Sequence, residues 1–111
     1  MNKTAIQTNN DTYLLRFSIN AHCEAEQLLG FPITQLSEDT AGMTTFRTLL
    51  FVGLKFGGNP VPMDKAGDIM EEVIQDQGMD YFSDKISEAI NKGLAQQQNS
   101  NFKQQHNSKK N

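Results

Sequence analysis

The 111-residue chain is long enough to form one domain with its own core and too short for two ordinary domains. Hydrophobic residues make up 37% of it and tryptophan is absent, so the core must be built from Leu, Ile, Phe and Met. Residues 1–95 carry 13 Asp and Glu against 7 Lys and Arg, and residues 96–111 add three lysines. Because nucleic-acid binding needs a basic patch, this acidic body argues against a nucleic-acid partner.

The sequence also argues against a membrane or secreted protein. No apolar run approaches the roughly 20 residues that span a bilayer, and the first residues lack the apolar core of a signal peptide. The single cysteine, Cys23, cannot form a disulfide within the chain, which fits a reducing compartment. We therefore expect a cytoplasmic protein in which Cys23 is a small buried residue.

The first 19 residues predict a β-hairpin. Apolar and polar residues alternate over residues 13–19, the pattern of a half-buried strand. The side chains expected on its inner face are Tyr13, Leu15, Phe17 and Ile19. Residues 9–11 have turn chemistry, so residues 4–8 are expected to form the partner strand. An isolated hairpin is marginally stable in water, and this one should lie on helices.

Residues 21–29 predict the first helix, with Asn20 as its N-cap. Its expected apolar stripe consists of Ala21, Ala25, Leu28 and Leu29. Gly30 is expected to take the left-handed conformation after the last turn, and Pro32 prevents the helix from continuing. A short turn should follow over residues 33–36.

The longest apolar run, residues 44–56, predicts a central helix with Thr44 as N-cap and Gly57-Gly58 as its end. Phe51 and Val52 project off its main apolar face, and a helix that is apolar nearly all round must be covered on more than one side. Two interpretations stay open: the chain's own helices cover these side chains, or a partner or second copy does.

Two further helices are expected to begin at Asp64 and Asp80, with Gly78 between them, and to form an antiparallel pair. Gly53 and Gly67 lie inside helical patterns, where glycine costs ~1 kcal/mol relative to alanine, so each is expected to allow a close helix–helix approach. The predicted fold is a single α+β domain over residues 1–95, an N-terminal β-hairpin packed on a small bundle of about four helices.

Residues 96–111 predict a disordered polar tail with one apolar residue, Phe102. Such a segment cannot bury enough surface to offset a backbone entropy of about 1–2 kcal/mol per residue. Two roles stay open for it, a solubilising extension or a recognition segment that carries Phe102.

The sequence offers no catalytic or metal-binding constellation. His22 and Cys23 are adjacent, and neighbouring residues on a helix point about 100° apart, so they cannot act on one atom. With His106, they are the only nitrogen or sulfur ligands among the side chains, too few for a zinc site. We therefore expect no enzyme activity, no metal and no cofactor.

The densest charge feature is a run of carboxylates at helical spacing. Its members are Asp64, Asp68, Glu71, Glu72, Asp76, Asp80, Asp84 and Glu88. The run is either a solvated helix face or a docking surface for a basic partner, and the sequence leaves both open.

Four segments between residues 12 and 95 carry a family resemblance: the strand Tyr13–Ala21, the helix Cys23–Gly30, the central helix Phe46–Leu54 and the start of a third helix, Met63–Met70. Their order and spacing resemble the tail assembly chaperones of long-tailed bacteriophages and related gene transfer agents. The resemblance implies a small non-enzymatic protein that is needed to build the phage tail.

Such chaperones are thought to coat the tape measure protein and to keep its long hydrophobic helices soluble until tail tube subunits polymerise around it. The resemblance therefore implies the tape measure protein, and possibly the tail tube protein, as partners of a homo-oligomer. It places the chain in the cytoplasm of the bacterial host and outside the mature virion. The alternative is a structural minor tail or connector protein that stays in the virion.

The partner contacts expected from the sequence lie on the central helix and in the tail. They are Phe51, Val52 and Phe56, with Phe102 as an anchor in the tail.

Overall fold

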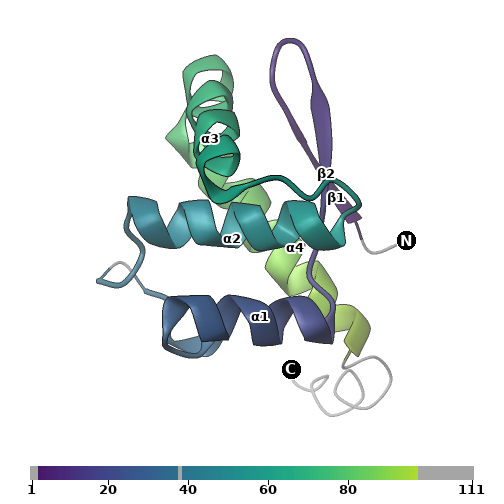
Figure 1. The fold of residues 1–111 in the computed structure, drawn as a ribbon, viewed down its shortest axis with the longest axis vertical. Coiled ribbons are helices and arrows are strands. Elements are labelled where there is room, and N and C mark those ends of the chain that lie inside the picture. The colour runs from purple at the N-terminus through teal and green to yellow at the C-terminus, as the bar shows by residue number, and fades with distance from the viewer. Residues whose placement is uncertain (1–2, 38, 98–111) are drawn as a thin grey trace, which may run out of the picture.

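The computed structural model describes residues 3–37 and 39–97 and shows an N-terminal antiparallel hairpin packed against four α-helices (Figure 1). The α+β class predicted from the sequence is thereby confirmed. Strand β1 (Lys3–Gln7) pairs with β2 (Thr12–Arg16), so that Thr4 lies opposite Leu15. The predicted tail from residue 98 onward lies outside the described residues.

One helix, α2 (Met43–Phe56), lies at the centre of the fold, and the other helices pack around it. In chain order the helical elements are α1 (Ile19–Leu29), the 3₁₀ turn η1 (Ile33–Gln35), α2, α3 (Met63–Gln77) and α4 (Met79–Gln97). Figure 1 shows α2 between α1 and α3, with α4 crossing behind it, and α2 contacts β2, α1, α3 and α4. The chain's own elements thus cover the central helix, the first of the two interpretations. Helix α4 continues to Gln97, beyond the expected domain boundary at residue 95.

The hairpin buries alternate side chains, as a period of two requires. Ile6, Leu15 and Phe17 are fully buried, whereas Leu14 on the opposite face is 38% exposed. Ile19 was expected on the inner face of the strand, but β2 ends at Arg16 and Ile19 is the exposed first residue of α1. The alternating pattern therefore predicted the strand correctly and its length incorrectly.

Polar contacts fasten the hairpin to the helices. The Tyr81 hydroxyl oxygen accepts a hydrogen bond from the Gln7 N–H at 3.0 Å. In the hairpin turn, the Asn9 N–H donates to Asp76 Oδ2 at 2.7 Å. Lys92 Nζ donates to the Lys3 carbonyl oxygen at 3.0 Å. Tyr81 and Lys92 both belong to α4, so this helix satisfies backbone groups of β1 that an isolated hairpin would leave unpaired.

Helix α1 begins earlier than predicted and buries fewer residues. Ser18, not Asn20, is its N-cap, and the Ser18 Oγ accepts the Ala21 N–H at 3.2 Å. Only Ala21 and Ala25 are buried on this helix, and Cys23 is exposed, so the prediction of a buried cysteine is wrong. The reason is geometric: Cys23 lies two residues from each alanine, which turns it roughly 200° away from the buried face.

The ends of α2 also differ from the prediction. The helix begins at Met43 after Gly42, which has no side chain to act as a cap, and Thr44 lies in the first turn. At the other end Gly57 has right-handed backbone angles, and Gly58 is the left-handed residue, with φ 105°. The glycine pair ends the helix as expected, and Gly58 is the member that takes the left-handed conformation.

Glycines bring the helices against the hairpin backbone. A Cβ on Gly53 would lie 3.0 Å from a ring carbon of Phe17, so the expected close approach exists, but its partner is the hairpin and not a helix. A Cβ on Gly57 would overlap the Leu14 carbonyl, and one on Gly93 would overlap the Phe17 carbonyl. These two contacts join α2 and α4 to the hairpin and were not predicted from the sequence.

Candidate partner-binding groove

The structure places the predicted contacts of the central helix mainly inside the fold. Val52 is fully buried and belongs to the core, so it does not lie on a surface that a partner could reach. Phe51 and Phe56 are half-buried and pack against the core. Phe102, the expected anchor in the tail, lies outside the described residues. The apolar side chains that α2 carries off its main apolar face therefore pack within the chain's own fold.

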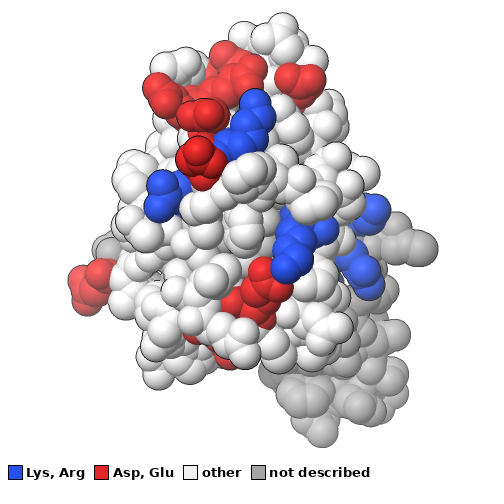
Figure 2. Space-filling model, in the orientation of Figure 1, with Lys and Arg blue, Asp and Glu red and all other residues white. Residues whose placement is uncertain are grey.

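The acidic run is partly solvated and partly engaged within the fold. Figure 2 shows carboxylates gathered at the end of the molecule that α3 occupies in Figure 1. Asp76 accepts the hydrogen bond from the hairpin turn, and Glu88 lies 3.4 Å from Lys85 Nζ and 3.7 Å from Lys92 Nζ. Asp68 and Glu71 are exposed. The α3 surface therefore carries a negative field that the fold itself does not fully neutralise.

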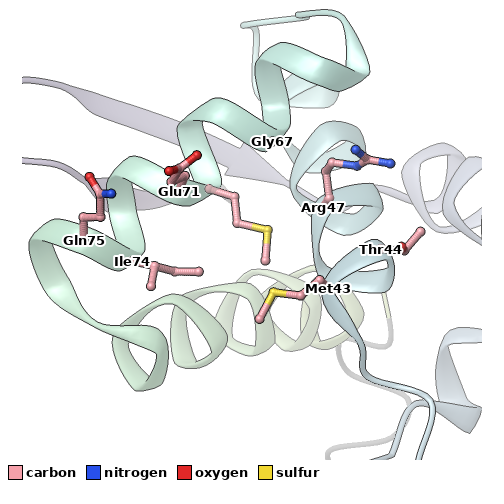
Figure 3. Close-up of a pocket in the computed structure, with 8 residues that line it drawn as sticks. Met43, Thr44, Arg47, Gly67, Glu71, Ile74 and Gln75 are labelled. Atoms are coloured by element: carbon pink, nitrogen blue, oxygen red, sulfur yellow. The ribbon is translucent and has the colours of Figure 1, made fainter.

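A groove of about 360 Å³ lies between the first half of α2 and the face of α3 beside it (Figure 3). Its lining residues are Met43, Thr44 and Arg47 of α2, and Gly67, Met70, Glu71, Ile74 and Gln75 of α3. We refer to this hollow as the α2–α3 groove.

The middle of the α2–α3 groove is apolar. Figure 3 shows Met43 and Ile74 directed into the same space from the two helices. Met43 is 64% exposed, the most of the large apolar side chains in the described residues, while Met70, which lines the same hollow, is 5% exposed. Unbranched thioether side chains adjust to irregular apolar partners, so this lining suits a ligand whose side chains vary.

The two walls of the groove carry opposite charges. Arg47 stands on α2, and its stem lies over Gly67 of α3, where a Cβ would come within 3.2 Å of Arg47 Cδ. This confirms the expected close helix–helix approach at Gly67. Glu71 stands on α3, and neither Arg47 nor Glu71 forms an ion pair within the described part of the chain. The Nε of Arg47 is buried without a hydrogen-bond partner.

The histidine and the cysteine of the first helix do not form a site. His22 Nδ1 lies 3.0 Å from the Ser18 carbonyl oxygen, and its ring meets the Phe17 ring edge-on at 5.8 Å between centroids. These contacts join α1 to the hairpin. Within residues 3–37 and 39–97, no three His, Cys, Asp or Glu side chains gather as the ligands of a metal ion would. In the same ranges no helix has the length and apolarity to cross a bilayer.

The groove was not predicted from the sequence, because the central helix was expected to begin at Thr44, which left Met43 outside it. The usable signal was the spacing. Met43 and Arg47 are four residues apart on α2, and Gly67, Met70 and Ile74 follow at three and four residues on α3, so each set shares one helix face. Only the packing of α2 against α3 decides that the two faces meet at an open edge.

Comparison of the chain with models of protein families, with curated proteins and with solved structures found no significant match. The resemblance of the four segments to tail assembly chaperones therefore stays a prediction.

Proposed function

We propose that the chain is a non-enzymatic binding protein that holds an apolar helical segment of a partner in the α2–α3 groove. The observation that carries this proposal is an open, apolar hollow with Met43, Met70 and Ile74 at its centre. Amphipathic helices dock in such grooves through side chains that recur every three or four residues.

The family resemblance supports a particular client. A chain with the order of elements of a tail assembly chaperone would hold the tape measure protein in the cytoplasm of a bacterial host while the tail tube assembles. Long hydrophobic helices aggregate in water unless another protein shields them. A methionine-lined groove can shield such helices without requiring one fixed sequence, because methionine side chains adapt to different apolar partners.

Co-expression with the long helical protein encoded just downstream tests the proposal. We expect that protein to stay soluble and to co-purify with this chain. If it precipitates regardless, the chaperone function is excluded, and the chain should be sought in purified particles. A structural minor tail or connector protein would remain there, whereas a chaperone would be absent.

Met43→Asp tests whether the groove is the binding surface. Met43 is the first residue of α2 and is 64% exposed, and an acidic residue in the first turn of a helix is favourable, so the variant should fold. We expect it to lose the client, because a carboxylate would stand in the apolar centre of the groove.

Ile19→Asp is the matched control for that variant. Ile19 is the first residue of α1 and is 52% exposed, so the chemical change and its helical position are the same, but the residue lies outside the groove. The control should keep the client. Loss of the client in both variants, or in neither, would contradict the assignment of the groove.

A further inference from the structure

We infer that the α2–α3 groove selects an amphipathic helix that carries a carboxylate on the flank facing Arg47 and a basic side chain on the flank facing Glu71. This inference rests on the proposed function, because it names the chemistry of the partner of the same groove. It is argued from the unpaired charges of the two walls.

Arg47 is the charged residue of the α2 wall. Its stem is held against α3 at Gly67, and its Nε is buried without a hydrogen-bond partner, so the guanidinium is already partly removed from water. Covering the groove would remove more water from it. A cation in that position needs a carboxylate, whose two oxygens match the planar fork of guanidinium donors. A helix that is apolar on all sides would leave Arg47 covered and unpaired, which disfavours its binding.

Glu71 is the charged residue of the α3 wall. It stands on the opposite wall, beside Gln75, and no cation pairs with it within the described residues. Carboxylates gather at the end of the molecule that α3 occupies, so this wall lies in a negative field (Figure 2). A lysine or arginine on the partner helix would be attracted to this negative wall and could pair with the Glu71 carboxylate. The groove is therefore positive on its α2 wall, negative on its α3 wall and apolar between them.

The test uses two synthetic helical peptides of about 18 residues, roughly 27 Å as a helix, with the same leucine stripe. One carries glutamates along one flank of the stripe and lysines along the other, and the second carries glutamine at all of these positions. Binding to the purified full chain is measured by fluorescence anisotropy. We expect the charged peptide to bind about fivefold more tightly, and this preference to shrink as salt is raised.

Neutral variants assign the preference to the two walls. Arg47→Gln and Glu71→Gln should each reduce it from about fivefold to about twofold, because each removes one of the two charge pairs and leaves the other. Lys65→Gln and Asp68→Asn make the same changes of charge on exposed α3 residues outside the groove, and both should keep it.

The outcomes separate this inference from the proposed function. Equal affinity of wild type for the two peptides would overturn the charge selection and leave an apolar binding groove standing. Loss of the preference in Lys65→Gln or Asp68→Asn as large as in the groove variants would assign it to the general field of the protein and overturn the roles of Arg47 and Glu71. Failure of both peptides to bind would overturn the groove itself, and with it the proposed function.

Discussion

The junction between the hairpin and α4 and the α2–α3 groove both place a glycine against another element, but the neighbours differ. At the junction, a Cβ on Gly93 would overlap the backbone carbonyl of Phe17. At the groove, a Cβ on Gly67 would meet the stem of Arg47 at 3.2 Å. A carbonyl at the end of a strand cannot move without disturbing the sheet, whereas an arginine stem can change rotamer. The fold is therefore rigid where backbones meet and adaptable where side chains line the groove.

The largest expected effect comes from placing the same methyl group in both regions. Gly93→Ala should lower the free energy of unfolding by about 2–4 kcal/mol, because the carbonyl overlap outweighs the better helix propensity of alanine. Gly67→Ala should change it by less than about 1 kcal/mol, because the propensity gain offsets a small shift of Arg47. Urea unfolding followed by circular dichroism measures both. Equal costs for the two variants would remove the contrast between the regions.

An intermediate effect is expected from aspartate at two positions of the central helix, Phe51 and Met43. Phe51→Asp should lower the free energy of unfolding by about 2 kcal/mol, because the side chain packs against the core and a carboxylate there loses water. Met43→Asp, in the groove, should change it by about 0.5 kcal/mol or less. The same unfolding experiment compares them. A Phe51→Asp chain that stays equally stable but loses its client would show that Phe51 is a partner contact, as the sequence first indicated.

The smallest expected effect is a pH dependence at Tyr13, a residue of strand β2. Its pKa is raised above the ordinary 10.0 by burial first, and then by the negative charges of Asp11 and Glu72. The neutral phenol is thus favoured in the folded state, so its contribution to stability is fully present below pH 10 and is lost as the pH rises through the raised pKa.

Urea unfolding of wild type and Tyr13→Phe between pH 8 and pH 11 checks this expectation, in steps of about half a unit around the ordinary tyrosine pKa. Both proteins share all other titrations, so only the difference between them reports on Tyr13. Wild type should lose stability relative to Tyr13→Phe above pH 10. A constant difference across the range would show that folding leaves the Tyr13 pKa unchanged.

Local chemistry was readable without the structure. Alternation identified the strand at residues 13–16, and Gly30 and Gly78 ended their helices with positive φ values, as glycine permits and other residues resist. The periods of the four helices were recognisable for the same reason, because helix formation and termination depend on residues within one or two turns. The α+β class follows from these local features.

The groove, and whether each predicted contact is buried or exposed, could not be predicted from short-range sequence patterns. Val52 and Met43 are both apolar residues of one helix, and nothing in their neighbours along the chain shows that the first is fully buried and the second 64% exposed. The same holds for Gly93, whose partner Phe17 is far away in sequence. The sequence by itself determined the elements and where they end, because those depend on short-range backbone and side-chain chemistry. Only the tertiary structure decided which faces are covered, because that depends on contacts between distant segments.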